Sequence, residues 1–300
     1  MKAKLTATAI IISVAAVGCG GDDAAEKPPA SVPAGAIAAV GTSKSGVISQ
    51  KTFNRFLNAQ IKGTSPLGGS ISGGIPIDPP GFTRCKAAVI ANSVKNKQPK
   101  PTAAQAKASC DAQYAQTKAA VESQLISYQW LIQESLSRNL KAADSEIDQT
   151  LNQYISVAAG GGKPTAPAKA KAAFNSRLKA SGLTVDDIKL QLRAQILQQK
   201  MSQKDFESIE EPSTDQAESF YNANKDLFRA TAGGKLPEFS KVVEQAKSQL
   251  KSRQLQVKQV KFQNSLQKKW RAATLCAKDY IVAQCSNGPK LPDLVPPKVD

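Results

Sequence analysis

The chain has 300 residues, a formal net charge of +16, 5% aromatic residues and no histidine. The lack of histidine excludes Ser-His-Asp and Cys-His catalytic sites and His-ligated zinc, so acid–base chemistry would fall to carboxylates, tyrosine or lysine. The abundance of alanine, glutamine and lysine favours helices over sheets, in one or two domains.

The first residues have the features of an export signal. Lys2 and Lys4 precede a mostly apolar run at residues 5–17, which is shorter than the ~20 residues that span a membrane. The ending AVGC resembles a bacterial lipobox, which implies that residues 1–18 are a lipoprotein signal peptide and that Cys19 is acylated. We therefore expect an extracytoplasmic protein, lipid-anchored to the bacterial cell membrane. The alternative is an ordinary signal peptide that leaves a free thiol.

Loss of Lys2 and Lys4 with the signal lowers the net charge from +16 to +14. For an exported chain, this charge predicts anionic lipid, anionic cell-wall polymer or acidic client polypeptides as partners, and no nucleic acid. The alternative is a solvated basic surface without a specific partner.

The mature chain begins with irregular segments around a short ordered unit. Residues 19–35 predict a flexible tether. A short strand is expected at Ala36–Val40, and Ser49 is placed to cap a helix at residues 50–61. Residues 63–81, rich in Gly, Pro and Ser, predict an irregular linker.

Helical spacing of apolar residues continues through most of the remaining chain. One predicted helix begins at Asp144, and another follows Thr184, where Asp187 completes a capping box. Further helices are predicted over residues 82–97, 102–139 and 237–273, with two shorter ones around Phe174 and Phe220. Residues 289–300 are predicted to be a disordered tail.

Four cysteines remain besides Cys19, and an even number in an exported chain predicts disulfides. Three pairings are possible, and the grouping along the sequence favours Cys85–Cys110 and Cys276–Cys285. A four-cysteine zinc site is the rival interpretation, but the spacings contain no C-x-x-C pair.

No group of residues has a spacing typical of catalysis. The segment GGGKPT at residues 160–165 lacks the strand-to-helix context of a phosphate-binding loop. The carboxylate pairs Asp186–Asp187 and Glu210–Glu211 lie at helix boundaries, where capping explains them. We therefore predict no catalytic residue, no cofactor and no metal site.

The order of segments resembles exported foldases of the SurA and PrsA type. The opening AIAAVGTSKSGVISQKTFNRFL resembles their short strand, turn and first helix. LISYQWLIQESLSRNLKAADSEIDQTLNQYI, FNSRLKASGLTVDDIKLQLRAQILQQKM and STDQAESFYNANKDLF resemble the segments that follow. The resemblance covers residues 36–228.

The chain departs from this pattern after Phe228, where those foldases insert a parvulin prolyl isomerase domain. Only RATAGGK, residues 229–235, stands at this point, whereas a domain needs at least ~50 residues. The resemblance therefore implies a mainly α fold: a SurA N-terminal or trigger-factor-like helical chaperone body at residues 36–288, with at most a short N-terminal strand and no parvulin domain.

The expected function is a membrane-tethered holdase or folding factor that binds unfolded or newly secreted polypeptides without catalysis. Two alternatives remain open. The resemblance allows a peptidyl-prolyl cis-trans isomerase, and the basic residues 235–278 allow a structural lipoprotein that binds cell wall or membrane.

Four aromatic residues are predicted to contact clients because they lie in the segments that resemble the chaperone body, and aromatic rings offer a large apolar contact area. They are Tyr128, Trp130, Tyr154 and Phe174. The alternative for each is a place in the core.

The two ends of the mature chain are expected to pack together, because neither can bury its apolar face alone. Residues 36–61 should contact the helix at residues 237–273. In this arrangement Phe53, Phe56 and Leu57 face Val260, Leu266 or Trp270.

Overall fold

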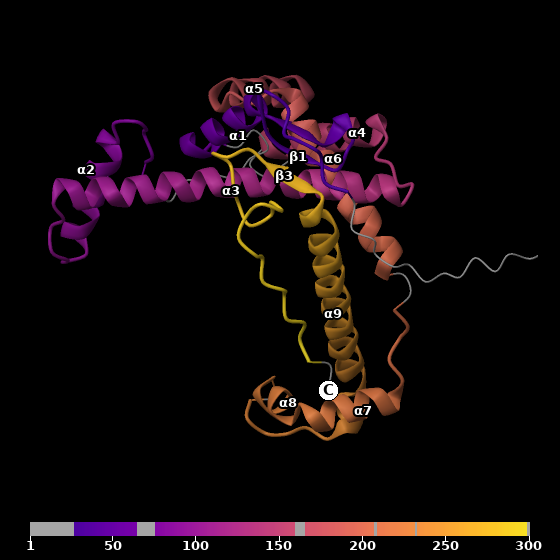
Figure 1. Cartoon of the computed structure of the whole chain (residues 1–300). Coiled ribbons are helices and arrows are strands. Elements are labelled where there is room, and N and C mark those ends of the chain that lie inside the picture. The colour runs from indigo at the N-terminus through magenta and orange to yellow at the C-terminus, as the bar shows by residue number, and fades with distance from the viewer. Residues whose placement is uncertain (1–26, 65–75, 160–165, 207–208, 232, 299–300) are drawn as a thin grey trace, which may run out of the picture.

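The computed structural model describes residues 27–64, 76–159, 166–206, 209–231 and 233–298. These residues are mainly helical, as predicted (Figure 1). The predicted signal peptide and Cys19 lie outside the described residues. Within these ranges, no helix combines the length and the apolar character needed to cross a membrane. The helices are α1 (Gln50–Lys62), α2 (Thr83–Lys95), α3 (Ala103–Ser137), α4 (Asp144–Ala159), α5 (Pro167–Ser181), α6 (Val185–Phe206), α7 (Thr214–Ala223), α8 (Lys225–Thr231) and α9 (Val243–Ala272).

A small antiparallel sheet joins the two ends of the described chain. Its strand order is β2-β1-β3, with β1 at Ala36–Val40, β2 at Val47–Ser49 and β3 at Thr274–Cys276. The prediction of at most one strand was therefore wrong. β2 and β3 are three residues long, and each becomes a strand only because β1 supplies its hydrogen-bonding partner.

The largest apolar core lies where the sheet, α1 and the middle of α3 meet. Its fully buried side chains include Ile37, Val40, Phe53, Leu125 and Ile126. A second core lies between α4, α5 and α6 and includes Ile147, Phe174, Leu178, Ile188 and Leu192. We call the sheet with α1 and α3–α6 the body.

Local sequence signals act in the body as predicted. Ser49 accepts a hydrogen bond from the Thr52 amide at the start of α1. At the start of α6, the Thr184 hydroxyl accepts from the Asp187 amide, and the Asp187 carboxylate accepts from the Thr184 amide. Asp187 also binds the Arg55 guanidinium through two bonds of 2.6 Å, which fixes α1 against the start of α6.

Both predicted disulfides are present. Cys85–Cys110 holds α2 against the N-terminal part of α3, and Cys276–Cys285 closes the loop that follows β3. The zinc alternative is thereby contradicted, because the four sulfurs are bonded in two separate pairs.

A second, smaller unit lies away from the body, at the far end of α9 (Figure 1). Its core contains Phe220, Tyr221, Phe228, Ala246 and Leu250. We call α7, α8 and the first turns of α9, up to Leu250, the lobe.

The long C-terminal helix begins six residues later than Pro237, where the sequence predicted its start. A 3₁₀ turn, Phe239–Lys241, precedes Val243, the first residue of α9. Phe239 packs against Tyr221, whose hydroxyl donates to the carbonyl of Pro237. These lobe contacts hold residues 237–242 outside the helix.

The predicted meeting of the chain ends occurs. The Gly41 amide donates to the Ala273 carbonyl at 2.8 Å, and Trp270 shares the large core with Phe53, Phe56 and Leu57. Leu266 packs against this core, whereas Val260 does not belong to it. The ring of Phe53 meets Tyr280 edge-on, with 5.2 Å between centroids.

Candidate polypeptide-binding surface

The middle of α9 spans the distance between body and lobe (Figure 1). None of its residues 251–269 is buried, although Leu250 and Trp270 on either side are. We call residues 251–269 the bridge. The larger apolar side chains on the bridge are half-buried, namely Leu255, Val257, Val260, Phe262 and Leu266. Apolar side chains that remain partly accessible to solvent can contact another chain.

At its body end, the bridge borders a groove of about 390 Å³. We call it the body groove. Apolar walls come from Tyr128 and Leu131 of α3, from Phe262 and Leu266 of α9, and from Leu291 beyond the last strand. Six glutamines line the same groove: Gln124, Gln198, Gln259, Gln263, Gln267 and Gln284. Because an amide side chain both donates and accepts, this lining can bind a peptide main chain next to apolar side chains.

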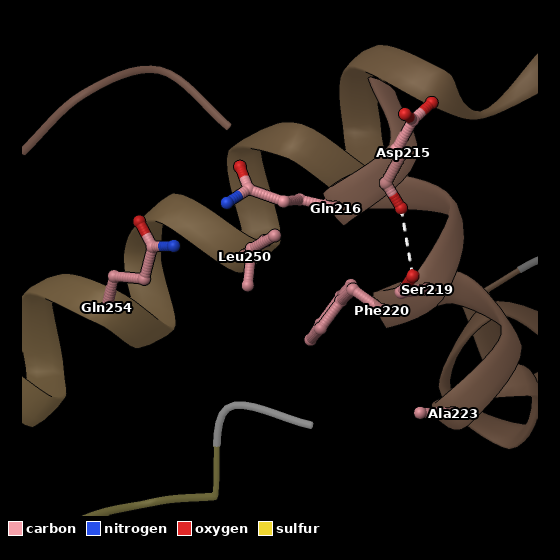
Figure 2. A pocket seen from close by; sticks show the side chains of 7 residues that line it. All are labelled: Asp215, Gln216, Ser219, Phe220, Ala223, Leu250 and Gln254. Carbon is pink, nitrogen blue, oxygen red and sulfur yellow. Dashed lines mark hydrogen bonds between the residues drawn. The ribbon is translucent and has the colours of Figure 1, made fainter. Parts of the chain in front are cut away.

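At the lobe end, α7 and α9 enclose an open groove of about 530 Å³, the lobe groove. Figure 2 shows Gln216 and Phe220 of α7 opposite Leu250 and Gln254 of α9. The Arg253 guanidinium lies over the Phe220 ring, 5.0 Å from its centroid. This groove thus combines an apolar floor with amides and a nearby cation.

The lobe groove adjoins a more polar hollow of about 400 Å³ that shares Gln216 and Gln254 with it. Acidic residues line one part of this hollow and lysines another, among them Glu210, Glu211, Lys258 and Lys261. The bridge therefore offers apolar, amide and charged groups to a bound chain, one after another along its length.

Two of the predicted client-binding residues are largely buried. The Trp130 side chain is 5% exposed, and its indole N–H donates to the Thr274 hydroxyl at 2.8 Å, but Trp130 is also one of the residues that line the body groove. Phe174 is buried in the core between α4, α5 and α6, so it has a structural role in the folded protein.

The other two predicted residues are half-buried. The Tyr154 hydroxyl is hydrogen-bonded to the side chain of Gln195 between α4 and α6, away from the bridge. Tyr128 lines the body groove and accepts a hydrogen bond of 2.7 Å from the Gln124 amide. Burial raises the pKa of the Tyr128 phenol, so it stays a neutral hydroxyl that can donate. Of the four residues, Tyr128 and the more deeply buried Trp130 line the body groove.

The sequence-based selection missed the bridge residues Val257, Phe262 and Leu266. One signal could have found them: the apolar stripe of this helix shifts register between Leu250 and Trp270. A stripe that shifts cannot stay on one core-facing side of a straight helix, because each residue advances about 100°. Such a stretch leaves some apolar groups outside the core.

The described residues contain one close group of potential metal ligands, Glu122 with Cys276 and Cys285. Both sulfurs are engaged in a disulfide and cannot act as thiolates.

No protein-family model, no curated protein and no solved structure matches the chain.

Proposed function

We propose that the protein is a non-catalytic holdase-type chaperone that binds unfolded or newly secreted polypeptides outside the cytoplasm, tethered to the membrane by a lipid on Cys19. The observation that carries this proposal is the bridge. It is a 19-residue stretch of α9 without a buried residue, between two folded units that each place a groove against it.

The grooves suit the weak and unselective binding that a holdase needs. Apolar residues such as Phe262 and Leu266 bury apolar client side chains, at roughly 25 cal/mol per Å² removed from water. The glutamine amides hydrogen-bond to main-chain groups, which every client has. The net positive charge attracts acidic clients, and a lipid tether raises the protein's concentration where chains emerge.

An aggregation assay tests the proposal. The mature chain, starting after Cys19, should slow aggregation of an unfolded reporter at a near-equimolar ratio without ATP. The double variant Val257→Ser/Phe262→Ser should lose this effect by about threefold or more, because it removes apolar area from the middle of the bridge, where Val257 lines the polar hollow and Phe262 lines the body groove. The matched control is Val157→Ser, which removes an exposed apolar side chain from α4.

Circular dichroism must show that both variants fold like the wild type. If the double variant protects the reporter as well as the wild type, the bridge is not the binding surface. If the wild type gives no protection but binds cell-wall polymer, the wall-binding alternative replaces the chaperone. A catalysed rate in a prolyl-peptide assay would support the isomerase alternative instead.

A further inference from the structure

The C-terminal tail, residues 289–298, lies in an extended conformation along the bridge, from the body towards the lobe (Figure 1). The sequence predicted a disordered tail at residues 289–300, of which the structure describes residues 289–298. The tail has hydrogen-bonding partners on α9 that no local sequence pattern indicates.

Side chains of α9 bind the main chain of the tail. The Asn264 amide nitrogen donates to the Leu294 carbonyl at 2.8 Å, and its oxygen accepts from the Leu294 N–H at 2.9 Å. The Gln267 amide donates to the Pro292 carbonyl at 3.3 Å. These three bonds involve only groups that any extended peptide offers, so they do not depend on the side chains of the bound segment.

Two arginines hold the ends of the tail. Arg271 donates to the carbonyls of Gly288 and Pro289 and fixes the start of the tail at the body. Arg253, beside the lobe groove, donates to the Lys298 carbonyl at 3.2 Å. The spacing from Arg253 to Asn264 is eleven residues, close to three helical turns, so both side chains lie on one face of α9.

Beyond Leu291, which packs against the large core, the tail buries little apolar surface. Val295 is 88% exposed, and Leu294, which lines the body groove, is 43% exposed. Four of its ten residues are proline, at positions 289, 292, 296 and 297, and proline favours an extended backbone. Beyond Leu291, the tail is therefore held mainly by hydrogen bonds to its main chain, and another extended segment can make the same bonds.

We propose that the tail is an internal stand-in for the ligand, and that the Asn264 face of α9 binds extended, proline-containing segments of client polypeptides through their main chain. This inference deepens the proposed function and rests on it. A client has to displace the tail, which competes at the effective concentration of a tethered ligand, on the order of mM. Clients that also fill the body groove with an apolar side chain displace it best.

A fluorescent peptide with the tail sequence, PKLPDLVPPK, is the probe, and fluorescence anisotropy with the full mature chain is the readout. Leu294→Pro in the protein removes the N–H that donates to Asn264, together with a side chain that lines the body groove, and so loosens the tail while the sequence of α9 stays unchanged. We expect this variant to bind the peptide about threefold or more tightly than the wild type. Val295→Pro, the neighbouring change at an exposed position, is the matched control and should leave the affinity unchanged.

Asn264→Ala, introduced into the Leu294→Pro protein, should weaken peptide binding about fivefold, because it removes both bonds to the peptide main chain. Asn152→Ala, at an exposed position on α4, should have no effect. Equal peptide affinity for the wild type and Leu294→Pro, or no effect of Asn264→Ala, would overturn the inference. The same variants in the aggregation assay separate the two proposals: peptide binding as expected without reporter protection would refute the chaperone and leave the tail site.

Discussion

Two stretches of α3 each bury a glutamate, and the two carboxylates are in opposite situations. Glu122 is 1% exposed and lies against the Cys276–Cys285 disulfide, where its Oε1 accepts no hydrogen bond from the described residues. Glu134 is 6% exposed and accepts from the Trp270 indole at 2.8 Å, from Arg138 at 2.6 Å and from Lys269 at 3.0 Å. Both residues stand on one helix at similar depth, and only their neighbours differ.

Burial alone raises the pKa of a carboxyl group, whereas hydrogen-bond donors and cations close to the carboxylate lower it. Burial raises the pKa of Glu122 to about 8, and the nearby Lys118 ammonium opposes this only weakly. Burial acts on Glu134 in the same direction, but the bonds from Trp270, Arg138 and Lys269 outweigh it and lower its pKa. Glu134 is thus a charged carboxylate at the junction of α3 with α9. Glu122, beside the disulfide loop, is a carboxyl group whose raised pKa keeps it neutral at pH 7.

The largest expected effect comes from removing the Glu122 carboxyl group. Below its ordinary pKa of 4.5, folded and unfolded chains both carry the proton; between pH 4.5 and about 8, only the folded chain does. The free energy of unfolding therefore falls as the pH rises through this window, by up to about 5 kcal/mol at about 1.4 kcal/mol per pKa unit. Glu122→Gln should abolish this fall, as measured by urea unfolding at pH 5 and pH 8.

Glu218→Gln, at an exposed carboxylate on α7, serves as the control and should keep the wild-type dependence on pH. If Glu122→Gln retains the wild-type fall in stability, Glu122 is ionised in the folded protein and the contrast with Glu134 fails.

The next largest effect is expected at Glu134, with the opposite sign. Its lowered pKa means that the stabilisation is present above pH 4.5 and is lost as the pH falls through the folded-state pKa. Glu134→Gln leaves Arg138 and Lys269 without their shared anion and should cost about 3 kcal/mol at pH 7 in urea unfolding. The loss should shrink at low pH, where wild-type Glu134 is itself protonated. A loss that is the same at pH 7 and pH 3 would mean that packing and not charge is responsible.

A smaller effect separates the indole bond from the ion pairs. Trp270→Phe keeps an aromatic ring but removes one donor to Glu134, and should cost about 1–2 kcal/mol. Because the pKa of Glu134 then rises, acid unfolding should begin at a higher pH, which a fluorescence-monitored pH titration measures. Trp130→Phe is the matched control, since its indole donates to the Thr274 hydroxyl and not to a carboxylate. A shift in the acid unfolding of both variants would show that the indole bond to Glu134 has no special role.

Features that depend on neighbouring residues could be predicted from the sequence. The capping box at Thr184 and Asp187, the cap at Ser49 and the start of α4 at Asp144 follow from side chains within a few residues of the helix end. The disulfide pairing followed from grouping, because Cys85 and Cys110 are 25 residues apart and Cys276 and Cys285 are 9 apart. For the helix caps and the disulfide pairing, the local geometry of the chain and the short sequence separation are sufficient for a prediction.

The candidate surface could be predicted only in part. Tyr128 and Trp130 line the body groove, although Trp130 is largely buried in the large core, whereas Phe174, selected for the same reason, is buried in the core between α4, α5 and α6. Successive positions on a helix point in different directions, and the choice between core and surface depends on which helix packs against which side. Whether a given aromatic residue of a helix faces the core or the solvent therefore cannot be predicted from the sequence alone.

The sequence by itself determined a mainly helical chain with two disulfides and the ends of most helices, because these depend on periodicity, capping and short loops. Only the tertiary structure decided that β3 would pair with β1, that the tail would bind along α9, and that Glu134 would be charged while burial raises the pKa of Glu122. Many partners in these contacts are far apart in the sequence: Asn264 and Leu294 are 30 residues apart, and Ala38 and Cys276 are more than 200 apart. Hydrogen bonds and burial of this kind arise when the chain brings distant groups together, and no local pattern specifies them.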